Sequence, residues 1–111
     1  MTNIEKFLQQ VKQRKFDTYE TLLLLMRTNQ SRWFSWGVTK IFHLKDNGIA
    51  FWVNGNHHVG YVAVVLGWND TYTYYLVSQT GNPLKRVDEV YFDELQERID
   101  KDVEFVDDYK F

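Results

Sequence analysis

The residues of this chain best suited to chemistry are three histidines and several paired carboxylates. His57 and His58 are adjacent, and His43 falls on a neighbouring predicted strand. Consecutive side chains of a strand point to opposite faces, so His57 and His58 are poorly placed to bind one metal ion together. The chain also has no HExxH or HxH motif, in which metal-binding histidines often occur. We therefore interpret the histidines as solvated hairpin residues and predict no metal site.

The paired carboxylates lie toward the end of the chain, at Asp88-Glu89, Asp93-Glu94 and Asp107-Asp108. General acid–base catalysis needs carboxyl groups in a cleft with pKa values held apart, whereas these pairs lie in hydrophilic sequence. The chain has no cysteine, no GxSxG serine motif and no glycine-rich phosphate loop. We predict no catalytic residues, no cofactor and a protein that is not an enzyme.

Aromatic residues are the most distinctive feature of the composition. The chain holds four Trp, seven Tyr and eight Phe among 111 residues, and the core of a domain this size cannot easily hide them all. Trp and Tyr are also favoured at protein interfaces. Those on or beside predicted strands are Trp33, Trp36, Trp52, Trp68, Tyr72, Tyr74 and Tyr75. We take Trp36, Trp52, Trp68 and Tyr75 as candidates for binding a partner protein or a second copy of the chain, with core packing as the alternative role.

Two other functions stay open. The first is nucleic-acid binding through the sheet aromatics and the basic N-terminal helices, because residues 1–32 hold six basic side chains against three acidic ones. The sheet region itself is electrically balanced, with Lys40 and Lys45 against Asp46 and Asp70, which argues against a polyanionic ligand. The second is an enzyme whose site is assembled only in space.

Two capping boxes predict two N-terminal helices. In the first box, Glu5 follows Thr2 by three residues, and an apolar stripe comes next. In the second box, Asp17 and Glu20 precede a broader stripe, and this helix should end near residues 28–31. The stripes consist of Ile4, Phe7, Leu8 and Val11 in the first helix and of Tyr19, Leu22, Leu23 and Met26 in the second.

From residue 32 onward the apolar residues alternate with polar ones, which predicts a strand over residues 32–44 with Lys40 as an exception. Turns rich in Asn, Asp and Gly separate this strand from three more. The strand at residues 59–68 is apolar on both parities, so we expect cover on both of its faces. The other two predicted strands cover residues 49–53 and 71–78, and the turns cover residues 46–48, 54–56 and 69–70.

The end of the chain reads as a loop followed by a helix. The sequence predicts the loop over residues 80–83, a short extended segment over residues 87–91 and a helix that begins at a third capping box, Asp93 to Gln96. The acidic stretch of residues 104–111 is open to two interpretations, a docked segment or a frayed end.

Together these elements predict one α+β domain over residues 1–111, with two N-terminal helices, a four-stranded antiparallel β-meander and a C-terminal helix. The two N-terminal helices would cover one face of the sheet. The last helix, the acidic end or a partner chain would cover the other. The predicted core consists of Leu22, Leu23, Met26, Val38, Phe51, Val62, Val64, Leu66, Leu76, Leu95 and Ile99.

Further expectations concern the place of the protein in the cell. The longest apolar run near the start, Leu22 to Met26, is far too short to span a membrane. The first residues lack the apolar h-region of a signal peptide, and the absence of cysteine fits a reducing compartment. We therefore predict a cytoplasmic protein without a membrane partner.

The central strands and turns form a pattern of their own. It is carried by Trp36-Gly37, Ile49 to Gly55, His58 to Val62, Leu66 to Tyr75, Asp88 to Leu95 and Ile99-Asp100. Over residues 33–104 this pattern resembles small uncharacterised proteins of phages and other mobile genetic elements. The resemblance carries no catalytic signature. It implies a setting in which small acidic proteins often bind and block a host protein, as accessory or inhibitor proteins acting through protein–protein contacts.

Overall fold

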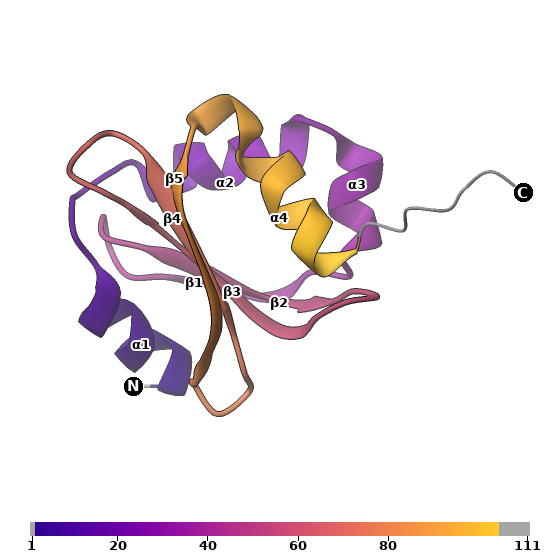
Figure 1. The fold of residues 1–111 in the computed structure, drawn as a ribbon, viewed down its shortest axis with the longest axis horizontal. Helices are drawn as coiled ribbons and strands as arrows, with labels where there is room; N and C mark the ends of the chain where they lie inside the picture. Colours follow the sequence, from indigo (N-terminus) through magenta and orange to yellow (C-terminus); the bar gives the residue numbers. More distant parts are fainter. Residues whose placement is uncertain (1, 105–111) are drawn as a thin grey trace, which may run out of the picture.

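A five-stranded antiparallel sheet with helices on both faces forms the framework of the protein (Figure 1). The computed structural model describes residues 2–104, so the two interpretations of the acidic end concern residues that lie largely outside the described part. The strands follow one another in chain order, which confirms the α+β class and the antiparallel meander. The elements are α1 (Asn3–Val11), α2 (Thr18–Arg27), α3 (Gln30–Ser35), β1 (Thr39–His43), β2 (Ile49–Asn54), β3 (Val59–Leu66), β4 (Tyr72–Val77), β5 (Pro83–Val90), the 3-10 turn η1 (Phe92–Glu94) and α4 (Leu95–Val103).

The first two helices begin at the residues that the capping boxes predict. The Thr2 hydroxyl accepts a hydrogen bond from the Glu5 backbone N–H, and the Glu5 carboxylate accepts one from the Thr2 backbone N–H. The Asp17 carboxylate accepts a hydrogen bond of 2.9 Å from the Glu20 backbone N–H. Both signals work because they depend only on residues three apart in the chain.

The prediction of a strand over residues 32–44 is wrong in its first half. Residues 30–35 form α3, and the Asn29 side chain caps it by accepting from the Arg32 backbone N–H. Trp33 and Trp36, three residues apart, are both buried. Their spacing is that of one face of a helix, and the prediction interpreted this region with the two-residue period of a strand. β1 begins only at Thr39, after Gly37 adopts a left-handed φ of +60°.

The sheet has one more strand than predicted. The segment expected as a loop and a short extended piece is β5, an edge strand of eight residues. Pro83 begins it, where the missing backbone N–H of proline costs least. The third capping box was also misplaced, because Asp93 lies inside η1 and the Glu94 carboxylate instead accepts from the Tyr91 backbone N–H.

The two N-terminal helices cover opposite faces of the sheet, which corrects the prediction that they share one face. Figure 1 shows α1 on one side and α2, α3 and α4 together on the other. α1 packs on a cluster that joins the small residues Ala50 and Ala63 to the larger ring of Tyr75, and it also lies close to the β1–β2 turn, where a Cβ at Gly48 would lie 3.0 Å from Leu8 Cδ2. We call the sheet face under α2, α3 and α4 the helical face, and the other the α1 face.

The helical face holds the larger core. Most of the predicted core residues lie in it, with Val38 and Leu66 half-buried against it. Leu23 and Met26 were predicted wrongly, since each is 37% exposed on the outer flank of α2. The core on this face consists of Leu22, Leu25, Trp33, Trp36, Ile49, Phe51, Val53, Val62, Val64, Tyr72, Tyr74, Leu76, Val90, Leu95, Ile99 and Val103.

Polar side chains join the three helices of the helical face at their centre. The buried Gln96 amide donates to the Leu25 carbonyl over 2.7 Å and to the Asn29 carbonyl over 3.0 Å. The Trp36 indole N–H donates to Asp100 Oδ1 over 2.8 Å, and Arg32 lies beside the other oxygen of the same carboxylate. Within residues 2–104, no buried side-chain nitrogen or oxygen lacks a hydrogen-bond partner. α4 is therefore locked to α2 and α3 by specific bonds as well as by apolar packing.

The short linker between α1 and α2 crosses from one face to the other at one end of the sheet. The Arg14 backbone N–H donates to the Leu66 carbonyl over 3.1 Å, and the Phe16 N–H donates to the Asp46 carbonyl over 2.7 Å. These bonds hold residues 12–16 against the β1–β2 and β3–β4 turns. No helix among residues 2–104 is long and apolar enough to cross a membrane.

Candidate docking surface around Trp68

The four aromatic candidates from the sequence occupy very different environments. Trp36 is fully buried on the helical face, and Tyr75 is buried under α1. Trp52 is half-buried at the other end of the α1 face, and Trp68 is 74% exposed. The structure therefore does not bring the four together into one surface.

Three of the candidates are occupied by contacts inside the protein. Trp36 binds Asp100 through its indole nitrogen. The Tyr75 ring meets the edge of Phe7 at a centroid distance of 5.0 Å, and burial raises the pKa of its hydroxyl. The Trp52 ring packs edge-on against Tyr61 at 5.0 Å, and the Lys40 ammonium lies 5.7 Å from its centroid.

Trp68 differs because a tight turn holds its backbone while its ring projects from the protein. The Gly67 N–H donates to the Thr71 carbonyl over 2.8 Å, and Asp70 adopts a left-handed φ of +65°. The Asn69 side chain closes the turn by accepting from the Thr71 hydroxyl over 2.7 Å. Because the turn is already ordered, a ligand that binds the ring does not have to order the backbone at this point, which favours affinity.

A basic hollow lies on one side of Trp68. It measures about 520 Å³ and is formed where the linker crosses the end of the sheet. Arg14 forms an ion pair with Asp70, so the linker is attached to the turn that carries Trp68. The hollow is lined by Lys12, Gln13, Arg14, Lys15, Asn47 and Trp68.

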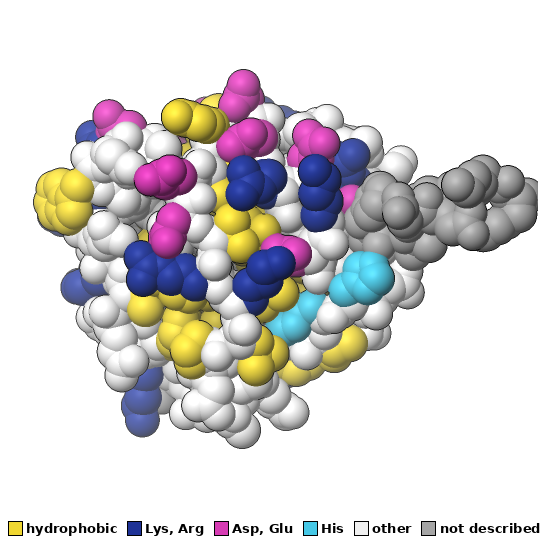
Figure 2. All heavy atoms as spheres, viewed as in Figure 1, with side chains coloured by type: hydrophobic (Ala, Val, Ile, Leu, Met, Phe, Trp, Pro, Cys, Tyr) yellow, Lys and Arg dark blue, Asp and Glu magenta, His cyan; other side chains and the backbone are white. Residues whose placement is uncertain are grey.

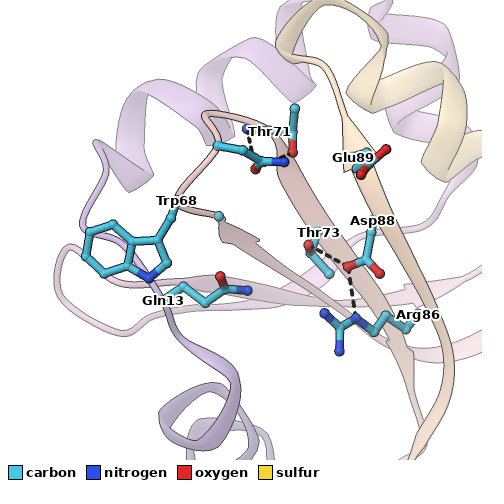
Figure 3. Close-up of a pocket in the computed structure, with 9 residues that line it drawn as sticks. Gln13, Trp68, Thr71, Thr73, Arg86, Asp88 and Glu89 are labelled. Atoms are coloured by element: carbon cyan, nitrogen blue, oxygen red, sulfur yellow. Dashed lines mark hydrogen bonds and ion pairs between the residues drawn. The ribbon is translucent and has the colours of Figure 1, made fainter.

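A second hollow, of about 320 Å³, lies on the other side of Trp68 (Figure 3). In Figure 3 the Gln13 amide points into it toward Arg86, whereas the Trp68 ring is turned away. Asp88 Oδ1 accepts hydrogen bonds of 2.9 Å from both the Thr73 hydroxyl and Arg86 Nε. These bonds, that of Arg86 first, lower the pKa of Asp88, so the carboxylate is ionised near neutral pH. We call this the acidic hollow, because Arg86 is its one cation and Asp88 and Glu89 are its two anions.

The backbone of β5 is distorted where it lines the acidic hollow. The pairing register between β4 and β5 shifts between Tyr72 and Tyr74, opposite Asp88 and Glu89. Glu89 has a φ of +57°, a left-handed conformation that is uncommon for a residue other than glycine, asparagine or aspartate. Bulges of this kind redirect side chains and occur often beside functional sites. The strain gives Glu89 a position that a regular edge strand would not provide.

The surface around the two hollows carries both signs of charge. Figure 2 shows the side of the molecule on which β5 lies, where Lys and Arg side chains are interspersed with Asp and Glu side chains. Within residues 2–104, Lys12, Lys15 and Glu89 form no ion pair, so their charges are available to a ligand. We call Lys12–Lys15, Trp68, Arg86, Asp88 and Glu89 the Trp68 surface.

The groups of the Trp68 surface suit binding better than catalysis. Asp88 has a lowered pKa and is held by Arg86 and Thr73, which makes it a poor general base near neutral pH. No set of three or more His, Cys, Asp or Glu residues in the described part of the chain could hold a metal ion.

Two of the three histidines are less exposed than the sequence indicated, whereas the His57 side chain is exposed. His58 is buried, and its Nε2 donates to the Tyr61 carbonyl over 3.0 Å. His43 is half-buried, lies 3.1 Å from the Thr18 hydroxyl and stacks on the Tyr19 ring at 4.2 Å. The interpretation of both as solvated residues was therefore wrong, because each fills a place in the packing beside its strand.

Sequence reasoning selected Trp68 but missed the charged residues around it. Lys12, Lys15 and Glu89 lie far from Trp68 in the chain, and only the path of the linker and the bulge in β5 bring them near. Comparisons with protein-family models, with curated proteins and with solved structures found no match. The resemblance to proteins of phages and mobile elements therefore stays a prediction.

Proposed function

We propose that this protein is a small non-enzymatic binding module that docks a segment of a protein chain on the Trp68 surface. The observation that carries the proposal is Trp68 itself: a ring 74% exposed, on a hydrogen-bonded turn, between two hollows of opposite charge. Exposed Trp residues rank among the commonest energetic centres of protein interfaces, and hollows beside them offer places for neighbouring side chains.

The arrangement of charge favours a protein segment over a nucleic acid. Lys12 and Lys15 beside an exposed ring resemble a site for stacking a base and binding its phosphates, which keeps nucleic-acid binding as the second candidate. A polyanion lying across Trp68 would, however, meet Asp88 and Glu89 on the far side. A peptide can place an acidic residue on one side of an apolar anchor and a basic residue on the other.

The resemblance of residues 33–104 suggests a setting for such a module. In that setting it would act in the cytoplasm as an accessory or inhibitor protein of a phage or mobile element, by occupying a surface of a host protein. The small size of the chain and its excess of aromatic residues support this role.

The test compares Trp68→Ala with Phe34→Ala. Phe34 is 75% exposed on α3, so it is a matched control for loss of an exposed ring elsewhere on the protein. Proteins captured from an extract of the source cells by each immobilised variant are quantified by mass spectrometry, and the affinity of a captured partner is then measured with purified components. We expect Trp68→Ala to weaken binding about thirty-fold or more and Phe34→Ala to leave it unchanged.

Three results would count against the protein-docking function. One is a partner that binds Trp68→Ala as tightly as the wild type, and another is equal loss with Phe34→Ala. The third is binding of single-stranded oligonucleotides that is abolished by Trp68→Ala and falls steeply with salt. That last result would favour the nucleic-acid function instead.

A further inference from the structure

The order of charge across the Trp68 surface defines the segment that would fit it. From the basic hollow to the acidic hollow, a ligand meets Lys12 and Lys15, then the Trp68 ring, then Glu89. The complementary segment has acidic residues first, an aromatic or apolar residue in the middle and a basic residue last.

The chain itself contains this order. Residues 105–111 read Phe-Val-Asp-Asp-Tyr-Lys-Phe, so Asp107 and Asp108 precede Tyr109, and Lys110 follows it. Resting on the proposed docking function, we infer that the occupant of the Trp68 surface is residues 105–111 of a second copy of this protein. The two aspartates face Lys12 and Lys15, and Lys110 faces Glu89.

Glu104, the described residue that precedes this segment, lies at the opposite end of the molecule from Trp68. The β2–β3 turn holds the end of α4, because the Asn56 N–H donates to Glu104 Oε2 over 2.8 Å and the His57 N–H donates to the Val103 carbonyl over 2.8 Å. A Cβ at Gly55 would lie only 2.3 Å from that carbonyl, so the contact depends on glycine. In Figure 1 the end of α4 and the β3–β4 turn lie on opposite sides of the view.

The segment is too short to reach Trp68 of its own copy. β3 separates the two turns, and its eight residues extend about 23 Å. Tyr109 follows Glu104 by only five residues of backbone, a span of at most about 17 Å. The segment would also have to pass from the helical face to the α1 face. A second copy has no such limit, so the contact forms between molecules.

A contact between one end of a molecule and the other end of the next is heterologous. Such contacts build rings or open chains of molecules, because each added copy still presents a free segment and a free surface. Assembly should therefore continue past the dimer as concentration rises. This behaviour distinguishes the inferred contact from a symmetric dimer formed by a single apolar patch.

The experiment uses the full chain with Trp68→Ala, with Tyr109→Ala and with both proteins mixed. Light scattering on the wild type should give a mass that rises with concentration. Over a range of about thirty-fold in concentration in which the wild type assembles, each variant alone should remain monomeric. The mixture should stop at a dimer, because Trp68→Ala supplies an intact segment and Tyr109→Ala supplies an intact surface. Phe34→Ala should assemble like the wild type.

A competing peptide supplies an independent measurement. A synthetic peptide of residues 105–111 should return the wild type to a monomer, whereas the same peptide carrying Asp107→Lys, Asp108→Lys and Lys110→Glu should not, since its charges then meet like charges. A wild type that stays monomeric, a mixture that stays monomeric or a charge-exchanged peptide that competes equally would overturn the inference. If the wild type is monomeric but a captured partner is lost with Trp68→Ala, the proposed docking function is supported, and the inference that residues 105–111 of a second copy occupy the surface is wrong. If Trp68→Ala changes neither assembly nor capture, both the docking function and the inferred occupant are wrong.

Discussion

The two faces of the sheet are built in different ways. Three helices cover the helical face, where Gln96, Asp100 and Arg32 link them through buried hydrogen bonds and an ion pair. A single helix covers the α1 face, through apolar contacts with residues of the sheet. The linker that follows α1 passes over the end of the sheet and leaves the Trp68 surface open beside it.

The two faces therefore differ in role: the helical face contributes mainly to stability, and the margin of the α1 face offers side chains for binding. A face joined by bonds that need specific partners tolerates little change, because a lost partner leaves a buried polar group unsatisfied. A face covered by one helix leaves side chains at its margin free to meet a ligand. Trp36 and Trp68 represent the two cases, one fully buried and the other 74% exposed.

The largest expected effect contrasts these two tryptophans. Trp36→Ala should lower the free energy of unfolding by about 3–5 kcal/mol, because it opens a cavity in the core and removes the indole donor of Asp100. Trp68→Ala should change it by no more than about 0.5 kcal/mol. Urea unfolding followed by circular dichroism measures both. Equal losses for the two variants would remove the distinction between the faces.

A smaller effect is expected when the bonds between the helices are broken. Gln96→Ala removes the donor to the Leu25 and Asn29 carbonyls and should lower the free energy of unfolding by about 1–3 kcal/mol. Gln10→Ala, at an exposed position of α1, is the matched control and should stay within about 0.5 kcal/mol of the wild type. A loss no larger for Gln96→Ala than for Gln10→Ala would show that apolar packing alone holds the helical face.

The smallest expected effect is a pH dependence at the margin of the helical face. Burial lowers the pKa of His43, so the unfolded chain takes up a proton more readily than the folded protein. This contribution to stability is therefore full above the ordinary histidine pKa of about 6.5 and declines as the pH falls below it. Urea midpoints at pH 8, 6.5 and 5 should decline less in His43→Gln than in the wild type. Parallel declines would assign the pH dependence to other groups.

The sequence predicted the features that depend on near neighbours. The caps at Thr2 and Asp17 and the turn at Asn47-Gly48 are all set by residues a few positions apart, and the structure confirms them. The strand prediction over α3 failed because Phe34, Trp36 and Val38 alternate as in a strand, whereas Trp33 and Trp36, three residues apart, also fit one turn of a helix. Only the position of Trp33 and Trp36 against Phe51, made possible by the sheet, separates the two.

The tertiary structure alone decided where the charges lie relative to Trp68. An amphipathic stripe indicates that a helix has an apolar side, but it does not indicate which face of the sheet the helix packs against. The sequence alone therefore allowed α1 and α2 to share one face. Their separation sends the linker across the end of the sheet, where the Arg14 backbone bonds to Leu66 and brings Lys12 and Lys15 beside Trp68. Local hydrogen bonds and side-chain periodicity are written in the sequence, whereas a surface made from segments far apart in the chain exists only after the sheet and its helices have packed.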